Sequence, residues 1–390
     1  MARRRSGELF PTDAPVAGAD LIGRADSVTA LTAQLEQHFH RIVTGPRRTG
    51  KTSVCQAAVD RLRRRGWYTV SLDMFALASL AEVAEALTLA VLSNRSTMKK
   101  VLTKARRTGR TIAAATATTV TTRMQGELGE VVEIAFRPGI ADRDPHRYFL
   151  DALALCERVA ERDDRQLVLF IDEFQEFGAE RQPYGEVDRL TKQMRSVLQK
   201  SDRVTCLFAG SIEHLMAELF TPRRRAFYRF GGFFSLPPID DPDWRTGLAK
   251  RFARDDCTID GDALTLLVET GEGHPRATML VAQQAHAASL AAETNRIDVN
   301  LVREGLALAL AADAASLDSD VDRIRRLGRH TFLLARRVAH GDKPYVGSTP
   351  SSAARGLQAL RDAGFVERAG RGAWRLSDPL LRRYLVDMPN

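Results

Sequence analysis

The octet at positions 45 to 52 restricts the fold of this chain more than any other feature of its sequence. It reads Gly-Pro-Arg-Arg-Thr-Gly-Lys-Thr, which matches the pattern G-x-x-x-x-G-K-[ST], and it stands between a short apolar run and a run rich in Ala and Val. A glycine-containing loop in this position lets backbone N–H groups surround phosphate oxygens, and the helix that follows adds the positive end of its dipole. The pattern predicts a strand, a phosphate-binding loop and a helix, in that order.

The side chains of the loop suit the binding of ATP together with Mg²⁺. We expect Lys51 to reach the β and γ phosphates and the Thr52 hydroxyl to bind the metal ion. The residues expected to bind the nucleotide here are Gly45, Pro46, Arg47, Arg48, Thr49, Gly50, Lys51, Thr52 and Ser53.

A second element of the same chemistry lies in the run Leu167–Asp172, which is apolar and ends in a carboxylate followed by Glu173. Burial of this run as a strand places both acids at its carboxyl end. Asp172 would then hold Mg²⁺ through water, and Glu173 would act as general base on the attacking water. An apolar strand ending in Asp-Glu is common, and a helix N-terminus also accepts either acid, so the interpretation depends on the pairing with the phosphate-binding loop.

Short apolar runs alternate with helical patterns from Leu21 onward, which is typical of βα units around a parallel sheet. With 390 residues, of which 44% are hydrophobic, the chain is long enough for two or three domains. The expected strands are rich in Val, Ile, Leu or Phe, as strands covered on both faces are; they are Arg41–Thr44, Tyr68–Asp73, Leu167–Asp172 and Val204–Ala209.

Residues 1–20 combine three arginines with prolines and small residues, which predicts a flexible basic arm. The run Thr111–Thr122 has a biased composition and follows the basic segment Lys99–Arg110. We interpret it as an insertion between two strands and assign it no function.

The pattern becomes entirely helical after Asp240, which predicts a separate helical subdomain. The expected helices there are Leu248–Arg254, Ala263–Glu269, Arg276–Thr294 and Val299–Ala312. In the last 70 residues, helices at Arg323–Ala339 and Ser351–Ala363 precede a small hairpin with a turn at Gly370–Gly372, which is the outline of a winged helix-turn-helix.

Charge and cysteine content narrow the class of protein. The formal net charge of +8 favours an anionic partner such as nucleic acid, although basic patches are often only solvated faces. The four cysteines are too widely spaced for a zinc site or a disulfide scaffold, so we expect reduced, mostly buried thiols. No run approaches the roughly 20 apolar residues that cross a bilayer, and no signal-peptide stretch follows Met1, so we expect a cytoplasmic protein with no membrane partner.

Several motifs together make the chain similar to a known family, the archaeal-type ATPases near the border of the AAA+ and STAND groups of P-loop NTPases. Leu21-Ile22-Gly23-Arg24 resembles the family's F-x-G-R-E element beside the adenine, although Ala25 stands where that element has Glu. Ile171-Asp172-Glu173-Phe174-Gln175 resembles its DE-[FA]-Q element, and Asp378-Pro379-Leu380 with Arg382 and Tyr384 resembles the ending that follows its winged helix.

The resemblance implies an α/β P-loop NTPase with an AAA+-like parallel sheet, a helical lid and a C-terminal winged helix-turn-helix. The corresponding domains are 21–240, 241–315 and 316–390. Gly23 and Arg24 would contact the nucleotide on its adenine side.

The resemblance also implies three further site residues. Ser211 looks like the polar sensor beside the γ-phosphate, although a serine after a strand is otherwise an ordinary helix cap. Arg229 resembles the arginine supplied to a neighbour's nucleotide in a homo-oligomer, with Arg223, Arg224 and Arg225 as alternatives. Gly273-His274-Pro275-Arg276 resembles the element that opens a lid helix, from which Arg276 would sense nucleotide.

The expected activity is Mg-dependent ATP binding and hydrolysis, with ATP and ADP as ligands. Two uses of that activity stay open. The winged helix could bind double-stranded DNA through the helix Ser351–Ala363 and through Arg368, Arg371 and Arg375 of the hairpin. Alternatively, it could dock protein in a nucleotide-dependent signalling or assembly switch.

Overall fold

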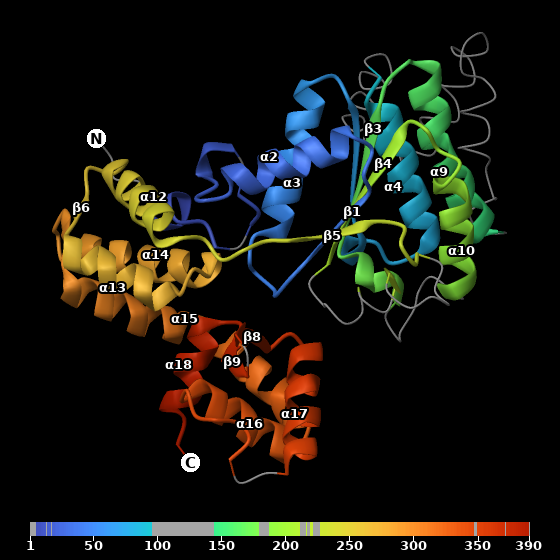
Figure 1. Cartoon of the computed structure of the whole chain (residues 1–390). Coiled ribbons are helices and arrows are strands. Elements are labelled where there is room, and N and C mark those ends of the chain that lie inside the picture. Colours follow the sequence, from blue (N-terminus) through green and yellow to red (C-terminus); the bar gives the residue numbers. More distant parts are fainter. Residues whose placement is uncertain are drawn as a thin grey trace.

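The computed structural model describes residues 5–12, 14–16, 18–95, 144–178, 187–210, 216, 219–220, 227–346, 349–370 and 372–389. Three regions are visible in Figure 1: an α/β core, a group of helices beside it, and a smaller C-terminal region next to those helices. The run Lys99–Thr122 that was interpreted as an insertion lies outside the described residues.

The described strands of the core form a five-stranded parallel sheet. The order is β2 (Tyr68–Asp73), β3 (Leu167–Asp172), β4 (Val204–Gly210), β1 (Arg41–Thr44) and β5 (Gly232–Ser235). β4 thus separates β1, which leads into the phosphate-binding loop, from β3, which ends in Asp172. This is the predicted fold, and the four predicted strands occur with the expected bounds to within one residue.

Both faces of the sheet are covered by helices, and the strands alternate accordingly. Val43, Val168 and Phe170 face α2 (Ala25–Glu36) and α3 (Lys51–Arg64), whereas Ile42 and Leu169 pack on the opposite side. That side is covered by α4 (Leu80–Ser93), α9 (Pro145–Arg162) and α10 (Val187–Leu198). Short 3₁₀ turns, η2 (Met74–Ala76) and η3 (Phe174–Gly178), follow β2 and β3 at the carboxyl edge of the sheet.

The helical region consists of four described helices and two short strands that pair in parallel. Its first helix, α12, begins directly after the segment that leaves the sheet at β5. The bounds are α12 (Asp241–Ala253), β6 (Thr258–Ile259), α13 (Gly261–Gly271), α14 (Pro275–Ala291), β7 (Arg296–Ile297) and α15 (Val299–Arg326).

The C-terminal region contains two helices, an antiparallel hairpin and a last helix. Their bounds are α16 (Arg329–Ala339), α17 (Pro350–Asp362), β8 (Val366–Gly370), β9 (Ala373–Leu376) and α18 (Pro379–Asp387). The helix, helix and hairpin order matches the sequence-based outline, but the helix expected at Arg323–Ala339 is divided at Gly328 between the end of α15 and α16.

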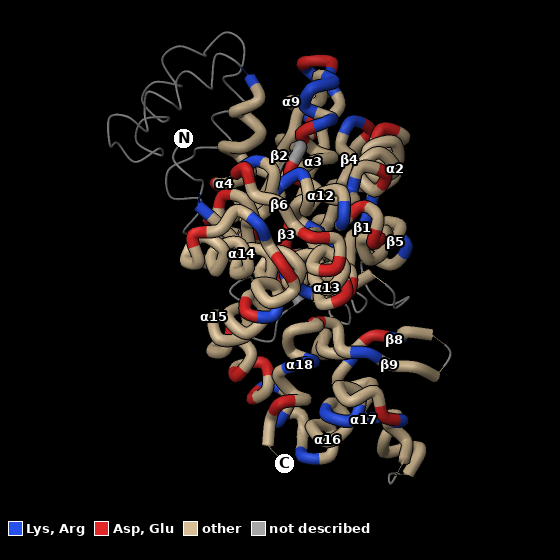
Figure 2. The backbone as a smooth tube through the Cα atoms, turned by 90° about the vertical axis from the view of Figure 1, so that its left-hand side faces the viewer, with Lys and Arg blue, Asp and Glu red and all other residues tan. Residues whose placement is uncertain are grey.

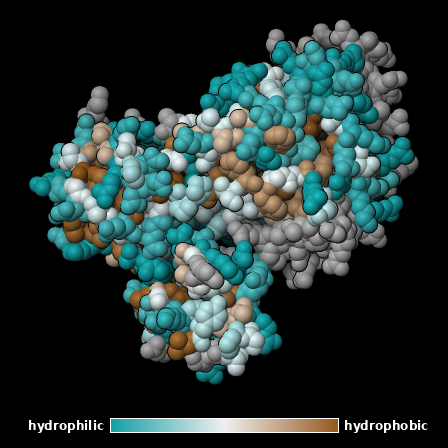
Figure 3. Space-filling view, viewed as in Figure 1, coloured by the Kyte–Doolittle hydropathy of each residue, from teal (hydrophilic) through white to brown (hydrophobic). Residues whose placement is uncertain are grey.

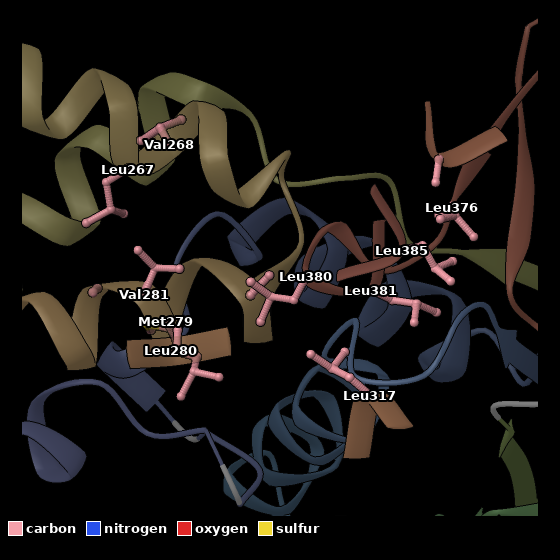
Figure 4. Close-up of a cluster of buried hydrophobic side chains, with 14 of the residues drawn as sticks. Leu267, Val268, Met279, Leu280, Val281, Leu317, Leu376, Leu380, Leu381 and Leu385 are labelled. Atoms are coloured by element: carbon pink, nitrogen blue, oxygen red, sulfur yellow. The ribbon is translucent and has the colours of Figure 1, made fainter. Parts of the chain in front are cut away.

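The predicted boundary between residues 315 and 316 is wrong as a structural division, because it falls inside the unbroken helix α15. The helical and C-terminal regions also share one hydrophobic core. In Figure 4, Leu280 and Val281 of α14 and Leu317 of α15 lie in the same cluster as Leu380 and Leu385 of α18. Helix α15 therefore belongs to both regions.

The prediction of a flexible arm over residues 1–20 is also wrong for the residues that the structure describes. A short helix, α1 (Ser6–Leu9), packs against α14, and Leu9 and Phe10 are 1% and 0% exposed. The Phe10 ring lies 4.7 Å from the Phe252 ring between their centroids, and Arg251 donates to the Leu9 carbonyl. Burial of the Phe10 ring stabilises this segment by about 2 kcal/mol relative to an exposed ring. A turn η1 (Gly18–Asp20) then leads to α2.

Charges of both signs are mixed over the part of the chain that the structure describes. Lys and Arg alternate with Asp and Glu over the helical and C-terminal regions in Figure 2, and the face drawn in Figure 3 is mostly hydrophilic with smaller apolar areas. All four cysteines are buried free thiols, as predicted. Among the helices that the structure describes, none combines the length and the apolar character that a membrane span requires.

Candidate nucleotide site

A cavity of about 520 Å³ lies where the core, the helical region and the N-terminal segment meet. The carboxyl edge of the sheet supplies Asp73, Asp172 and Glu173, and α14 supplies Arg276 and Met279. The loop after β1 contributes Arg47, Arg48, Gly50, Lys51, Thr52 and Ser53. A cavity of this size between two regions is typical of a small-molecule site.

The loop before α3 has the backbone that its glycines predict. Gly45 and Gly50 have φ of 147° and 85°, and Arg48, at φ 66°, is a non-glycine residue in the left-handed region. Lys51 is 6% exposed, and its Nζ donates to the carbonyl oxygens of Gly45 at 2.9 Å and Pro46 at 2.6 Å. The loop therefore wraps around the ammonium group, next to the N-terminus of α3.

Thr52 and Asp172, the two residues expected at the metal, are in direct contact. Thr52 Oγ1 donates to Asp172 Oδ2 at 2.7 Å, and Asp172 Oδ1 accepts from the Glu173 N–H at 3.0 Å. Burial raises the pKa of the Asp172 carboxyl, while the Thr52 hydrogen bond opposes that rise. A hydroxyl and a buried carboxylate side by side are hard oxygen donors, which fit Mg²⁺ with phosphate oxygens and water as the other ligands.

Glu173 lies at the same edge in a strained backbone conformation, at φ 50°. Its carboxylate accepts a hydrogen bond from Gln175 Nε2, and Gln175 is 1% exposed. Gly210, the last residue of β4, packs so closely on Gln175 that a Cβ there would lie 2.4 Å from Gln175 Oε1. Gln175 was not predicted as a site residue, although it belongs to the motif that resembles the family's DE-[FA]-Q element.

Arg276 reaches the cavity from the first turn of α14. Its side chain is 14% exposed and makes a two-pronged ion pair with Asp313 of α15, from Nη1 to Oδ2 at 2.6 Å and from Nη2 to Oδ1 at 2.8 Å. Arg48 of the loop approaches the same carboxylate at 3.7 Å and donates to Ser316 Oγ at 3.2 Å. Asp313 and Ser316 had no distinguishing signal in the sequence.

Of the two residues that the resemblance assigns to the adenine side, Arg24 lines the cavity and Gly23 does not. Gly23 is not among the residues that line the cavity, and a Cβ on it would lie 2.4 Å from Ile239. The Arg24 guanidinium, 3% exposed, donates to the carbonyls of Pro237 and Thr49. Burial lowers its pKa to about 10. Arg24 thus ties the phosphate-binding loop to the segment between β5 and α12.

His274 connects the same loop to α14 by a different route. It caps α14, with Nδ1 accepting from the Ala277 N–H, and its Nε2 lies 3.4 Å from the Arg47 carbonyl. Burial lowers the pKa of the imidazole, which is consistent with a neutral ring that donates from Nε2.

The N-terminal segment forms one wall of the cavity, which sequence reasoning missed. Pro11, Pro15 and Val16 line it, and the Val16 N–H donates to Ser53 Oγ at 2.9 Å. The segment thus spans from α14 to α3 across the site. Pro11 and Pro15 favoured the prediction of a flexible arm. The adjacent apolar residues Leu9 and Phe10 were the feature that could have predicted packing.

Ser211 and Arg229 were the other two residues predicted at the site. Ser211 lies outside the described residues. Arg229 is exposed, with its guanidinium 5.2 Å from the Tyr228 ring, and is not among the residues that line the cavity. The alternatives at 223 to 225 also lie outside the described residues.

Comparison with known proteins agrees with this geometry. Residues 20–204, which span the phosphate-binding loop and the strand ending in Asp172, match the family model of the AAA ATPase domain. The part of the chain that holds the phosphate-binding loop and Asp172 therefore resembles an AAA ATPase domain. No curated protein matches the chain by sequence.

Solved structures show a similar fold over nearly the whole chain. The Walker-type ATPase PABY2304 of Pyrococcus abyssi matches with a TM-score of 0.67 and 16% identity, over 97% of this chain and 99% of that one. The ORC2 protein of Aeropyrum pernix, solved in ADPNP–ADP complexes, matches with a TM-score of 0.59 and 16% identity, over 97% and 96%. At such low identity these likenesses establish the fold of the AAA ATPase domain and its neighbouring regions alone.

Proposed function

We propose that this protein is a Mg-dependent ATPase of the AAA+/STAND type, in which ATP binding and hydrolysis drive a change of conformation. The observation that carries the proposal is the convergence of Lys51, Thr52, Asp172 and Glu173 on one cavity between two regions. The bound ADPNP and ADP named for the Aeropyrum pernix structure support nucleotide as the ligand of this fold.

The residues of the site divide the reaction among them. Lys51 exchanges its contacts with the Gly45 and Pro46 carbonyls for phosphate oxygens, while the loop N–H groups and the α3 N-terminus bind the remaining negative charge. Glu173, oriented by Gln175, accepts the proton of the attacking water. Thr52 and Asp172 would hold Mg²⁺, which when bound supplies Lewis-acid stabilisation of the phosphate oxygens.

In this proposal the helical region acts as a lid and the C-terminal region as a winged helix that senses the state of the site. The supporting observation is a second cavity, of about 80 Å³, behind the loop. It is lined by Pro46 and Thr49 of the loop, His274, and Arg375 and Leu376 of the hairpin. Arg382 of α18 pairs with Glu272 just before α14.

The hairpin contacts favour the switch over DNA binding as the use of the ATP. Arg375 Nε pairs with Glu367 at 2.6 Å, and the Arg368 guanidinium lies 5.4 Å from the Trp374 ring, so both groups already have partners within the hairpin. Arg371 lies outside the described residues. Arg355 and Arg361 of α17 are exposed and stay available to a phosphate backbone.

The test is steady-state phosphate release with Mg-ATP. We expect Lys51→Ala to weaken nucleotide binding at least about tenfold, because a charge-assisted phosphate contact is lost. Glu173→Gln should bind ATP normally and release phosphate on the order of a hundredfold more slowly. Normal turnover by Glu173→Gln would refute the assignment of the base.

Phosphate release measured with double-stranded DNA at two salt concentrations distinguishes an enzyme that acts on DNA from a nucleotide-dependent switch. Stimulation that falls steeply with salt would support an enzyme acting on DNA. Turnover indifferent to DNA, together with assembly that depends on ATP, would support the switch and a role for Arg229 in a neighbouring copy.

A further inference from the structure

Asp313 of α15 is a buried carboxylate that pairs with two arginines of the cavity and that the proposed reaction does not use. Its side chain is 5% exposed, and two arginines share it. Arg276 approaches through both terminal nitrogens, at 2.6 and 2.8 Å, and Arg48 lies 3.7 Å away. The arginines come from α14 and from the phosphate-binding loop, so one carboxylate on a third element joins both sides of the site.

Both arginines line the same cavity as Lys51 and Thr52. A guanidinium binds a phosphate with the same fork of N–H groups that it offers to a carboxylate. Arg276 presents that fork to Asp313, so it cannot present it to a phosphate at the same time. A phosphate group placed in the cavity therefore competes with Asp313 for Arg276.

We propose that Asp313 is a positioning residue that holds Arg276 and Arg48 away from the phosphates until ATP displaces it. This inference rests on the proposed function, since it requires ATP in the cavity. ATP competes better than ADP, because its γ-phosphate adds the negative charge that offsets the loss of the carboxylate. Asp313 thereby sets how strongly the site prefers ATP over ADP.

The position of Asp313 on α15 carries this exchange to the C-terminal region. Ser316, which accepts from Arg48, lies within one turn of it, and Leu317 enters the core shared with α18. Asp318 then accepts from the Tyr384 hydroxyl of α18 at 2.6 Å. If Arg276 and Arg48 leave Asp313, α15 loses two of its contacts with the site, and any shift of α15 is passed to α18 because the next turn of α15 contacts it.

The experiment measures dissociation constants for Mg-ATP and Mg-ADP by calorimetry, with Glu173→Gln as the background so that ATP is not consumed. We expect Asp313→Asn to raise the preference for ATP over ADP by about fivefold or more, since Arg276 is released to the γ-phosphate. Asp313→Glu retains the charge and should stay within about twofold of the background. Adding Arg276→Gln to Asp313→Asn should abolish the gain.

Asp322→Asn is the matched control, because it removes a carboxylate whose partner, Arg325, lies on the same helix, and it touches neither arginine of the site; its preference for ATP should be unchanged. An unchanged or reduced preference in Asp313→Asn would overturn the inference and leave Asp313 as a purely structural partner. Absence of nucleotide binding in the background itself would instead refute the proposed function.

A second measurement uses the chain with its native Asp313, in case Asp313→Asn does not fold. Amide hydrogen exchange over residues 310–318 should be faster with Mg-ATP than with Mg-ADP, again in the Glu173→Gln background. Equal exchange in the two nucleotide states would overturn the inference.

Discussion

Gln175 is a neighbour that orients Glu173. Gln175 is almost fully buried, donates to the Glu173 carboxylate, and is itself fixed by its close contact with Gly210 at the end of β4. A general base acts efficiently only when its carboxylate is held in place, so the contribution of Gln175 should appear in the chemical step and not in binding.

Gln175→Leu tests this division, since it preserves approximate volume and removes the donor. We expect kcat for phosphate release to fall by about tenfold or more while the affinity for ATP changes by less than about twofold. A variant that instead raised KM at constant kcat would show that Gln175 serves nucleotide binding.

His40 is a second residue with a measurable role, in stability. Its Nδ1 accepts from the Cys206 N–H at 3.0 Å and its ring stacks on Phe230 with centroids 4.4 Å apart. Burial lowers the pKa of the imidazole from 6.5 to about 4. Because the folded pKa lies below the unfolded one, the full contribution to stability is present above about pH 6.5 and is lost as the pH falls from there toward about 4.

The expected loss over that window is about 3 kcal/mol in the free energy of unfolding. Urea unfolding of the native chain and of His40→Asn at pH 7.5, 6 and 5 measures it. Asn keeps an acceptor for Cys206 and does not titrate, so the gap between the two chains should narrow on acidification. Parallel curves would contradict the neutral, buried state of His40.

At the scale of elements, the N-terminal segment unites the helical region with the site. Phe10 packs between Phe252 and His286, while Val16 contacts Ser53 of α3. Phe10→Ala should destabilise the protein by roughly 3 kcal/mol, the usual cost of such a cavity, and should also weaken ATP binding because the wall from Pro11 to Val16 loses its anchor.

Thermal unfolding with and without Mg-ATP checks both effects at once. The matched control is Leu308→Ala, a truncation of an exposed apolar side chain on α15, which should change neither quantity. A loss of stability in Phe10→Ala without a loss of nucleotide affinity would show that the N-terminal segment does not contribute to ATP binding.

The elements differed in how far the sequence could predict them. The sheet and the loop were predictable because Val43 and Val168 belong to continuous apolar runs and because the loop has a strict residue pattern. The junction at residues 315 and 316 was not, because Asp313, Ser316 and Asp318 give α15 a polar stretch that looks like a linker until its partners Arg276, Arg48 and Tyr384 are in place. The role of Arg24 likewise depended on two backbone carbonyls that no pattern reveals.

At the scale of the whole molecule, the core shared by α12 to α18 predicts that the helical and C-terminal regions unfold together. Trp244 of α12 and Trp374 of β9 lie in or against that core and can report on each region separately. Two variants, one with Trp67→Phe and Trp374→Phe, the other with Trp67→Phe and Trp244→Phe, should show the same urea midpoint by fluorescence. Two distinct midpoints would indicate independent regions.

Helix α15 extends 28 residues without a break, from β7 to the turn before α16. At about 1.5 Å per residue, the part beyond Asp313 is a rigid arm of roughly 20 Å. If that arm tilts by about 10° when the arginines change partner, its far end moves by roughly 3 Å. A rearrangement of one ion pair at the nucleotide would then become a larger displacement at the C-terminal region, because α15 would turn about the point where Asp313 meets the phosphate-binding loop.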